Sequence, residues 1–162
     1  MLASELAEPY PTVGLGSSAV EAARLLTEHH RPALVVVDEH DHPVAILPGS
    51  QVLRLVIPGY LQDDVKLASV VDDSFVDQMC DALVGKTVAE LLPRDHDDLP
   101  VVRPDDTVLE VAVLMVVERS PLVAVVDGPG KTAPMIGAIT LTTVLREILP
   151  ERLGERGATE PR

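Results

Sequence analysis

The sequence predicts an α+β fold built from two pseudo-symmetric β-α-β-β-α repeats that pack through their sheets, and three observations support it. Residues 11–38 align without gaps with residues 100–127, so that each residue pairs with the one 89 positions later. After a turn that is three residues longer in the second copy, residues 44–58 align with residues 136–150. The chain is 46% hydrophobic but only 2% aromatic, which predicts an aliphatic core. A duplication of this kind indicates that each copy forms one supersecondary unit.

The two copies share polar residues and prolines as well as aliphatic positions, which argues against a chance similarity of two amphipathic segments. Several other aligned pairs exchange one aliphatic residue for another. The nine identical pairs of the first stretch are Pro11/Pro100, Val13/Val102, Glu21/Glu110, Ala23/Ala112, Leu25/Leu114, Pro32/Pro121, Val36/Val125, Val37/Val126 and Asp38/Asp127.

Each repeat contains the same series of local signals. Side-chain oxygens at residues 17–18 and 105–107 can cap the start of a helix. Pro32 and Pro121 end these helices, because the residue before a proline is driven out of the helical region. The apolar runs that follow predict strands buried on both faces, and turns rich in Asp, Gly and Pro lead to the next strand. The predicted elements of the two repeats are an entry strand (12–13 and 101–102), a helix (19–29 and 108–119), a buried strand (34–37 and 123–126), a second strand (44–47 and 135–139) and a closing helix (50–57 and 142–149).

The duplication also predicts the domain organisation. Between the copies, apolar residues at helical spacing predict an amphipathic helix over residues 73–84. Short helical segments at residues 3–7 and 88–92 are expected to introduce the first and the second repeat. The predicted divisions are repeat 1 (1–58), a helical linker (59–85), repeat 2 (86–150) and a flexible C-terminal tail (151–162).

The charge and cysteine content argue against several classes of function. The formal net charge is −13, with 13 basic against 26 acidic residues, whereas nucleic-acid binding needs clustered Lys and Arg. Cys80 is the single cysteine, which excludes a disulfide framework. We see no signal peptide, and the longest apolar run, residues 111–117, is too short to cross a bilayer. We therefore expect a cytoplasmic protein that binds no nucleic acid and does not insert into a membrane.

Sequence patterns typical of enzymes are missing. The sequence has no Walker-type phosphate loop and no Gly-x-Ser-x-Gly motif, and Gly14-Leu15-Gly16 is too short for a dinucleotide fingerprint. Nothing assembles a nucleophile, a base and an orienting group. We therefore predict no enzyme activity, no catalytic residues and no required cofactor.

The repeated pattern resembles a known family. An extended entry, an X-Pro strand ending in Val-Val-Asp, an acidic turn and a segment that opens a helix look like a tandem cystathionine-β-synthase (CBS) domain pair, or Bateman module. The resemblance covers about residues 3–150 and is strongest at residues 120–127 and 136–140. It implies a pseudo-twofold pair of repeats with a cleft on each side, adenine-nucleotide-like ligands, dimerisation through helices and regulation of a partner enzyme, channel or transporter.

The sequence departs from this family where its ligand chemistry lies. In nucleotide-binding members a Thr or Ser contacts phosphate, and an Asp three residues later binds the ribose hydroxyls. The second repeat has Thr140 but carries Thr143 in place of the Asp, and the first has Pro48 and Gln51. A carboxylate accepts two hydrogen bonds from a vicinal diol, and losing a charge-assisted pair costs roughly 1.5–3 kcal/mol. The second repeat is therefore the better candidate for a ligand such as AMP, ADP, ATP or S-adenosylmethionine.

The candidate ligand-binding residues follow from the resemblance. Each has an alternative interpretation: the threonines can cap a helix, Gln51 can lie on a helix surface, and His30 and Arg119 can be solvated rather than meet phosphate. The candidates are Val101, Val102, Arg119, Ser120, Pro121, Leu122, Thr140 and Thr143 in the second repeat and, more weakly, Thr12, Val13, His30, Pro32, Ala33 and Gln51 in the first.

Two polar clusters contain residue types that bind metals. His40-Asp41-His42 and residues 95–98 offer imidazole and carboxylate groups, which are ligands for first-row metals. Both lie where the fold needs polar connections, and turns favour Asp for backbone reasons alone. We predict no metal site.

The segment over residues 109–117 is apolar on every side except at Glu110. A helix without a polar face must be buried on more than one side. A homodimer through this helix is the favoured explanation, and the alternative is that residues 59–92 fold over it.

Together these observations predict a stand-alone regulatory CBS pair that senses an adenine-nucleotide-like ligand in an inter-repeat cleft and modulates a partner protein. The alternative is a ligand-free interaction module that acts through its dimer surface. A small metal-binding domain is a third option.

Overall fold

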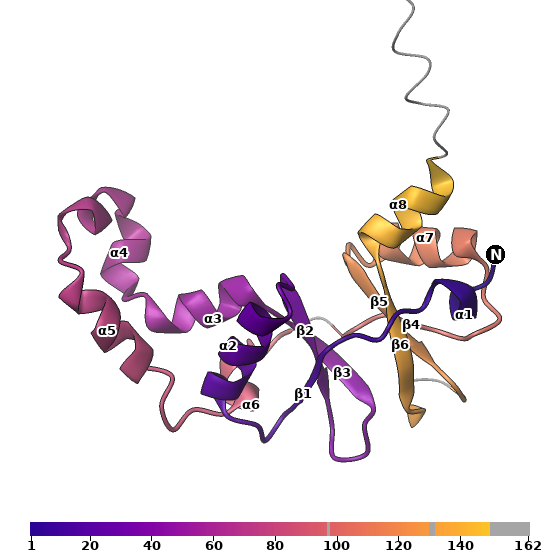
Figure 1. Cartoon of the computed structure of the whole chain (residues 1–162), viewed down its shortest axis with the longest axis horizontal. Helices are drawn as coiled ribbons and strands as arrows, with labels where there is room; N and C mark the ends of the chain where they lie inside the picture. Colours follow the sequence, from indigo (N-terminus) through magenta and orange to yellow (C-terminus); the bar gives the residue numbers. More distant parts are fainter. Residues whose placement is uncertain (97, 130–131, 150–162) are drawn as a thin grey trace, which may run out of the picture. The chain divides into compact units, whose positions relative to one another are not determined.

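The computed structural model describes residues 1–96, 98–129 and 132–149 (Figure 1). Asp97, Pro150 and the predicted tail 151–162 lie outside the described residues. The chain divides into two packing units. Tyr10–Asp98 forms the first-repeat unit, and Met1–Pro9 joins the described residues from Leu99 onwards in the second-repeat unit. Each unit has an aliphatic core of its own, as the composition predicted.

The first-repeat unit is built on a three-stranded sheet in the order β1-β2-β3. The entry strand β1 (Thr12–Gly14) is parallel to β2 (Ala33–Val37), which is antiparallel to β3 (Pro43–Pro48). All five residues of β2 are buried, which confirms the strand predicted to be covered on both faces. The helices α2 (Ala19–Glu28) and α3 (Gly49–Val56) pack on each other and on this sheet.

The second-repeat unit repeats this topology. Its sheet has the order β4-β5-β6, with β4 (Val101–Val102) parallel to β5 (Leu122–Val126) and β5 antiparallel to β6 (Met135–Thr140). The helices α7 (Val108–Val117) and α8 (Leu141–Ile148) lie together beside the sheet (Figure 1). Even the register shift recurs, after Val36 in one sheet and after Val125 in the other. The predicted α+β fold with two equivalent repeats is confirmed.

Two short helices pack with the repeat that the sequence did not assign to them. The helix α1 (Ala3–Leu6) buries Ala3 and Leu6 in the core of the second-repeat unit, and Ala3 N donates to Asp106 O at 2.7 Å. The helix α6 (Val88–Leu91) lies in the first-repeat unit, where Val88 N donates to Ser17 O at 2.9 Å. Each helix therefore precedes one repeat along the chain but completes the core of the other. The sequence repeats (1–58 and 86–150) and the packing units are different divisions of the chain.

The helices before the prolines end earlier than predicted. Instead of residues 19–29 and 108–119, α2 ends at Glu28 and α7 at Val117. His30 (φ 49°) and Arg119 (φ 51°) are left-handed, and the residue after each donates to the carbonyl five positions back. This turn pairs carbonyls that the helix leaves unsatisfied at its end. The left-handed residue, rather than the proline, ends each helix.

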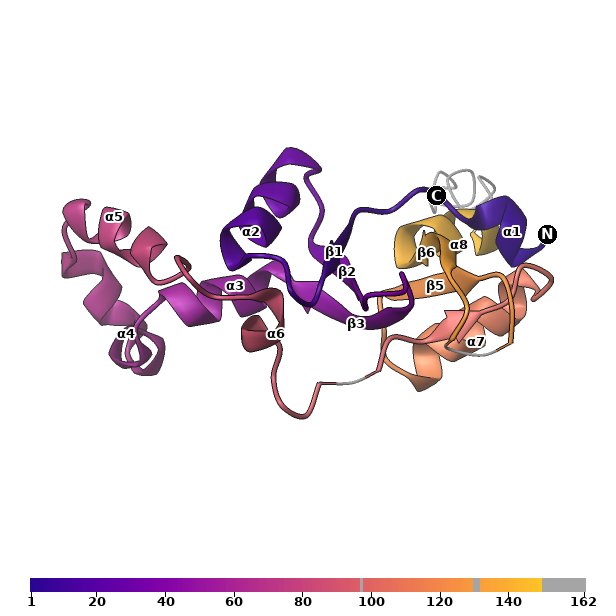
Figure 2. The ribbon, with the colours of Figure 1, turned by 90° about the horizontal axis from the view of Figure 1, so that it is seen from below.

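The linker between the repeats forms three short helical pieces, α4 (Gly59–Asp63), η1 (Val65–Val70) and α5 (Ser74–Asp81). The last of these is shorter than the amphipathic helix predicted over residues 73–84, and none of its residues is buried. Leu83, just beyond it, is the linker residue that joins the first-repeat core. In both views α4 and α5 lie beyond α3, away from the sheet (Figure 2). Among the described residues, no helix is long and apolar enough to cross a membrane.

Candidate ligand-binding site

The second-repeat candidates from residues 119–122, Thr140 and Thr143 gather at one end of the sheet, where β5 begins and β6 ends, whereas Val101 and Val102 pair with Ala124 and Val125 further along β5. Leu122 pairs with Thr140 across the two strands. Leu141 N, at the start of α8, donates to Pro121 O at 2.9 Å. The loop before β5 and the first turn of α8 are therefore held side by side. The first repeat has the same arrangement, because Gly49 N donates to Pro32 O at 2.8 Å.

The two threonines lie one turn apart at the start of α8. Thr140 is the N-cap, and its Oγ1 accepts from Thr143 N at 3.3 Å. The two hydroxyl oxygens are 3.1 Å apart, and Thr143 is only 8% exposed. A hydroxyl has one donor and two acceptor sites, so capping leaves Thr140, which is half-buried, with capacity for another partner. The helix is therefore capped by a threonine, as the alternative interpretation expected, but by Thr140 rather than at the predicted start, Thr142, and this cap is compatible with a ligand contact.

In the loop before β5, the Ser120 side chain is hydrogen-bonded and the Arg119 side chain is exposed. Ser120 Oγ donates to Leu122 O at 2.7 Å, so this hydroxyl closes the loop. Arg119 is exposed at the left-handed position. Val102, by contrast, is 5% exposed and belongs to the core, as does Val13 at 4% in the first repeat.

In the first repeat, the equivalent positions are occupied by the unit's own side chains. The Tyr10 hydroxyl donates to Ala33 O at 2.9 Å, and the Arg31 guanidinium lies 5.1 Å from the centre of the Tyr10 ring. Gln51 Nε2 donates to Leu91 O at 3.0 Å, which ties α3 to the end of α6. Burial raises the pKa of Tyr10, against the opposing effect of Arg31.

Tyr10 was missed by the sequence analysis. Its position directly before Pro11, and the rarity of aromatic residues, were the signals that could have found it. The comparison of the repeats adds a further point, because Ala33 and Leu122 are aligned residues. The backbone carbonyl of each accepts a hydrogen bond from a side-chain hydroxyl, that of Tyr10 in the first repeat and that of Ser120 in the second. Rotating a serine away from a local contact disturbs less packing than displacing a half-buried tyrosine.

Comparison with known proteins places the chain in a family. The family model for the CBS domain matches residues 3–57 and 88–150. The crystal structure of a CBS domain-containing protein of unknown function from Kribbella flavida is 49% identical, with a TM-score of 0.82 over 93% of this chain and 99% of that one. No curated protein matched the sequence.

More distant structures share the fold. CBSX2 in complex with AMP is 22% identical, with a TM-score of 0.61 over 91% of this chain and 96% of that one. A CBS domain pair in complex with 5′-methylthioadenosine and S-adenosyl-L-methionine is also 22% identical, with a TM-score of 0.61 over 91% and 95% of the two chains. With two family-model matches at the two repeats, and a relative that is nearly half identical over almost its full length, this chain belongs to the CBS domain family and contains a pair of CBS domains.

Proposed function

We propose that this CBS pair is a regulatory module that binds an adenine-nucleotide-like ligand at the second-repeat site and thereby modulates a partner protein. CBS-pair proteins are typically regulatory rather than catalytic. Two structures with the same fold were crystallised with AMP and with S-adenosyl-L-methionine and 5′-methylthioadenosine. The observation that carries the proposal is the juxtaposition of Thr140, Thr143 and the Pro121 loop at one end of the β4-β5-β6 sheet.

The chemistry of this site favours a phosphate-bearing nucleoside of moderate affinity. The Thr140 hydroxyl can donate to a phosphate oxygen, and Arg119 supplies a cation on the adjoining loop. Thr143 offers a hydroxyl where a carboxylate would bind a ribose diol more strongly. In the first repeat, Pro48 has no hydroxyl, and Gln51 is already bonded to Leu91. We therefore place the ligand in the second repeat.

The direct test is thermal unfolding of the full chain with AMP, ADP, ATP and S-adenosylmethionine. A ligand at about 100 times its Kd stabilises the folded state by about 2.7 kcal/mol, which corresponds to a rise in Tm of several degrees. Thr140→Val should reduce the ligand-induced rise in Tm, and Thr140→Ser, which keeps both the cap and the hydroxyl, should restore it. If no nucleotide shifts the Tm, ligand sensing at this site is wrong.

An exposed apolar surface supports a second function, that of a ligand-free interaction module. We define the α7 face as Leu109, Val113, Val116 and Val117, which are 54–77% exposed. A shallow groove of about 390 Å³ runs along it, lined by three of these residues with Glu110 and Leu114. The described residues of its own unit leave this face uncovered. We propose that a second copy of the chain covers it, giving a homodimer.

The first repeat supplies the contrast that supports this assignment. The α2 positions aligned with Val113, Val116 and Val117 are Arg24, Thr27 and Glu28. There Arg24 forms ion pairs with Glu21 at 2.7 Å and with Glu28 at 2.9 Å, so the surface suits solvent. Since the two helices are otherwise equivalent, the fold does not require valines on α7. Their presence fits a specific contact with an apolar partner surface.

A further inference from the structure

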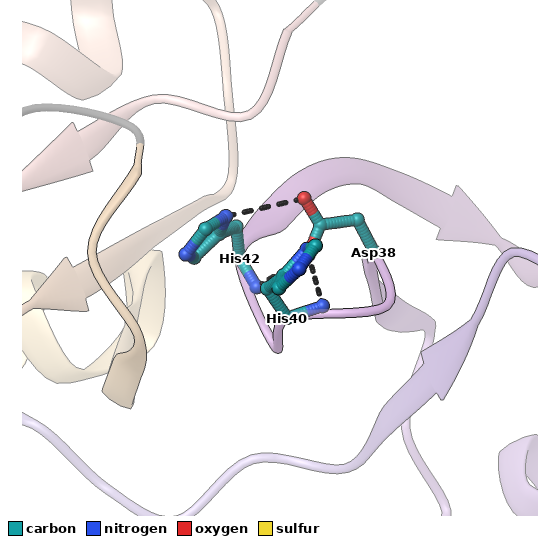
Figure 3. Close-up of side chains that lie close together, drawn as sticks. All are labelled: Asp38, His40 and His42. Atoms are coloured by element: carbon teal, nitrogen blue, oxygen red, sulfur yellow. Dashed lines mark hydrogen bonds and ion pairs between the residues drawn. The ribbon is translucent and has the colours of Figure 1, made fainter.

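The turn between β2 and β3 in the first-repeat unit brings two imidazoles and a carboxylate together. Asp38 Oδ1 accepts from His40 N at 2.8 Å and from His42 N at 3.0 Å, which fixes the turn. Asp38 Oδ2 lies 3.2 Å from His42 Nδ1. Figure 3 shows both imidazole rings beside this carboxylate, and their centroids are 5.7 Å apart. One ligand atom from each of the three residues lies within 4.8 Å of the others.

The 3.2 Å between Asp38 Oδ2 and His42 Nδ1 is close to what a metal ion requires. With bonds of about 2.0–2.2 Å, neighbouring ligand atoms around a tetrahedral zinc ion are about 3.3 Å apart. Asp38 and His42 are half-buried and held beside each other by the hydrogen bond between their side chains. The His40 side chain is exposed and can rotate toward them. Hydrogen bonds from the backbone N–H of His42, above all, and of His40 lower the pKa of Asp38 and keep it ionised. Imidazole nitrogen with carboxylate oxygen suits Zn²⁺, Co²⁺, Ni²⁺ and Cu²⁺.

The fold of the turn does not need the histidine side chains. The turn uses Asp38 Oδ1 and the left-handed Asp41 (φ 62°), together with backbone bonds such as Asp38 N to His42 O at 3.0 Å. The aligned turn of the second repeat, residues 127–134, keeps the aspartate but has no histidine. Two of the five histidines in the chain therefore lie in one turn without a structural requirement for an imidazole.

A hollow borders the same residues. It has a volume of about 620 Å³ and is lined by residues 14–17, which follow β1, and by Asp38, Glu39 and His40. Asp38 and His40 thus belong both to the three-residue cluster and to the wall of an open space. A metal ion held by three protein ligands keeps positions for water or a small ligand, and the hollow has room for them.

We propose that Asp38, His40 and His42 bind one divalent transition-metal ion through two imidazole nitrogens and one carboxylate oxygen, with its remaining positions open to the hollow. This reverses the prediction of no metal site, which treated the sequence cluster as a polar turn. The proposal is independent of the nucleotide site, since it concerns the other repeat and a different end of its sheet.

Titration of the metal-free full chain with Co²⁺, followed by absorption spectroscopy, and with Zn²⁺, followed by calorimetry, tests the proposal. We expect one ion per chain near pH 7.5. Asp38→Asn retains an oxygen acceptor for the turn but removes the charge, and should weaken binding at least tenfold. His42→Gln and His40→Gln should do the same, whereas His29→Gln, the control at an exposed histidine outside the cluster, should not.

Two outcomes would exclude a metal site at Asp38, His40 and His42. If the wild-type chain takes up no ion at 100 μM metal, or if His29→Gln weakens binding as much as His42→Gln, the site is wrong. Circular dichroism of the metal-free variants checks that each remains folded. Should Asp38→Asn unfold the turn, the decision rests on His40→Gln, because its side chain is exposed and makes no hydrogen bond that the turn depends on.

Discussion

At the scale of single residues, His30 and Arg119 lie in a left-handed backbone conformation that costs stability. A non-glycine residue in this conformation costs about 1 kcal/mol, because its Cβ crowds the neighbouring backbone. Both positions reverse the chain after a helix, where glycine is the usual choice. That a cation or imidazole occupies both positions fits a role for the side chain, at least in the second repeat.

Arg119→Gly should therefore separate the two effects. We expect the free energy of unfolding to rise by about 0.5–1 kcal/mol while the affinity for a phosphate-bearing nucleotide falls several-fold. His30→Gly, the aligned control, should raise stability similarly without changing nucleotide affinity. Chemical denaturation measures the first effect and calorimetric titration the second. Unchanged nucleotide affinity in Arg119→Gly would remove Arg119 from the site.

Glu110 gives a pH dependence whose sign follows from its contacts. Its carboxylate accepts from Thr107 N at 2.7 Å and from the Thr107 hydroxyl at 2.8 Å, completing the capping box of α7. These bonds, the backbone one first, lower the pKa of Glu110 below its ordinary value of 4.5. A lowered folded-state pKa means that the stabilisation is complete above the unfolded pKa and is lost as the pH falls through the folded one.

We expect Glu110→Gln to make the Tm less dependent on pH below about 4.5, because glutamine can still accept in the capping box but does not titrate. Thermal unfolding of the variant and the wild type between pH 7 and pH 3 measures this. Parallel curves for the two proteins would show that the capping carboxylate does not couple folding to protons.

At the scale of the elements, β6 depends on a glycine where the N-terminal segment crosses it. Glu8 N donates to Ala138 O and Ala138 N to Glu8 O, both at 3.0 Å. A Cβ at Gly137 would lie 3.0 Å from Glu8 O and 3.2 Å from Ala7 Cβ. The close approach of the segment that carries α1 therefore requires the absence of a side chain at Gly137.

Gly137→Ala should destabilise the second-repeat unit by about 1–3 kcal/mol, as overpacking does, and loosen the segment before it. Hydrogen exchange at residues 3–8 should quicken with the fall in Tm. Gly59→Ala is the matched control, since nothing lies within 4 Å of a Cβ at that position, and it should change the Tm little. If the backbone amides of residues 3–8 exchange hydrogen equally slowly in Gly137→Ala and in the wild type, the close approach does not depend on this glycine.

At the scale of the whole molecule, the asymmetry between the repeats matters more than their likeness. In the first repeat, the Tyr10 hydroxyl and the Gln51 side chain form hydrogen bonds within the unit, and α2 presents a charged surface. The second repeat leaves Thr140 with spare hydrogen-bonding capacity and exposes the α7 face. Duplication thus supplied two equivalent frameworks, and we infer that ligand binding and self-association both belong to the second.

The proposed homodimer predicts that Val116→Asp yields monomers. Val116 is 77% exposed in the single chain, so a charge there costs little for folding but would be buried unpaired in a dimer. Thr27→Asp, the aligned change on α2, should leave the dimer intact. Sedimentation velocity of the three proteins at matched concentration distinguishes the outcomes, and a Val116→Asp dimer would exclude the α7 face.

The sequence by itself determined the fold class, the two repeats and the strands buried on both faces. These features depend on local periodicity and on a duplication that can be read along the chain, as in residues 33–37 and 122–126. It also indicated that threonines begin the closing helix, although the cap is Thr140, two residues before the predicted start.

Only the tertiary structure decided which core each short helix completes, and which polar side chains are already engaged. A four-residue helix such as α1 or α6 has too little periodicity to specify a partner, so its place follows from packing between distant segments. The bonds of Tyr10 to Ala33 and of Gln51 to Leu91 likewise depend on three-dimensional proximity. Local sequence patterns do not encode such contacts, because they are formed when the chain closes on itself.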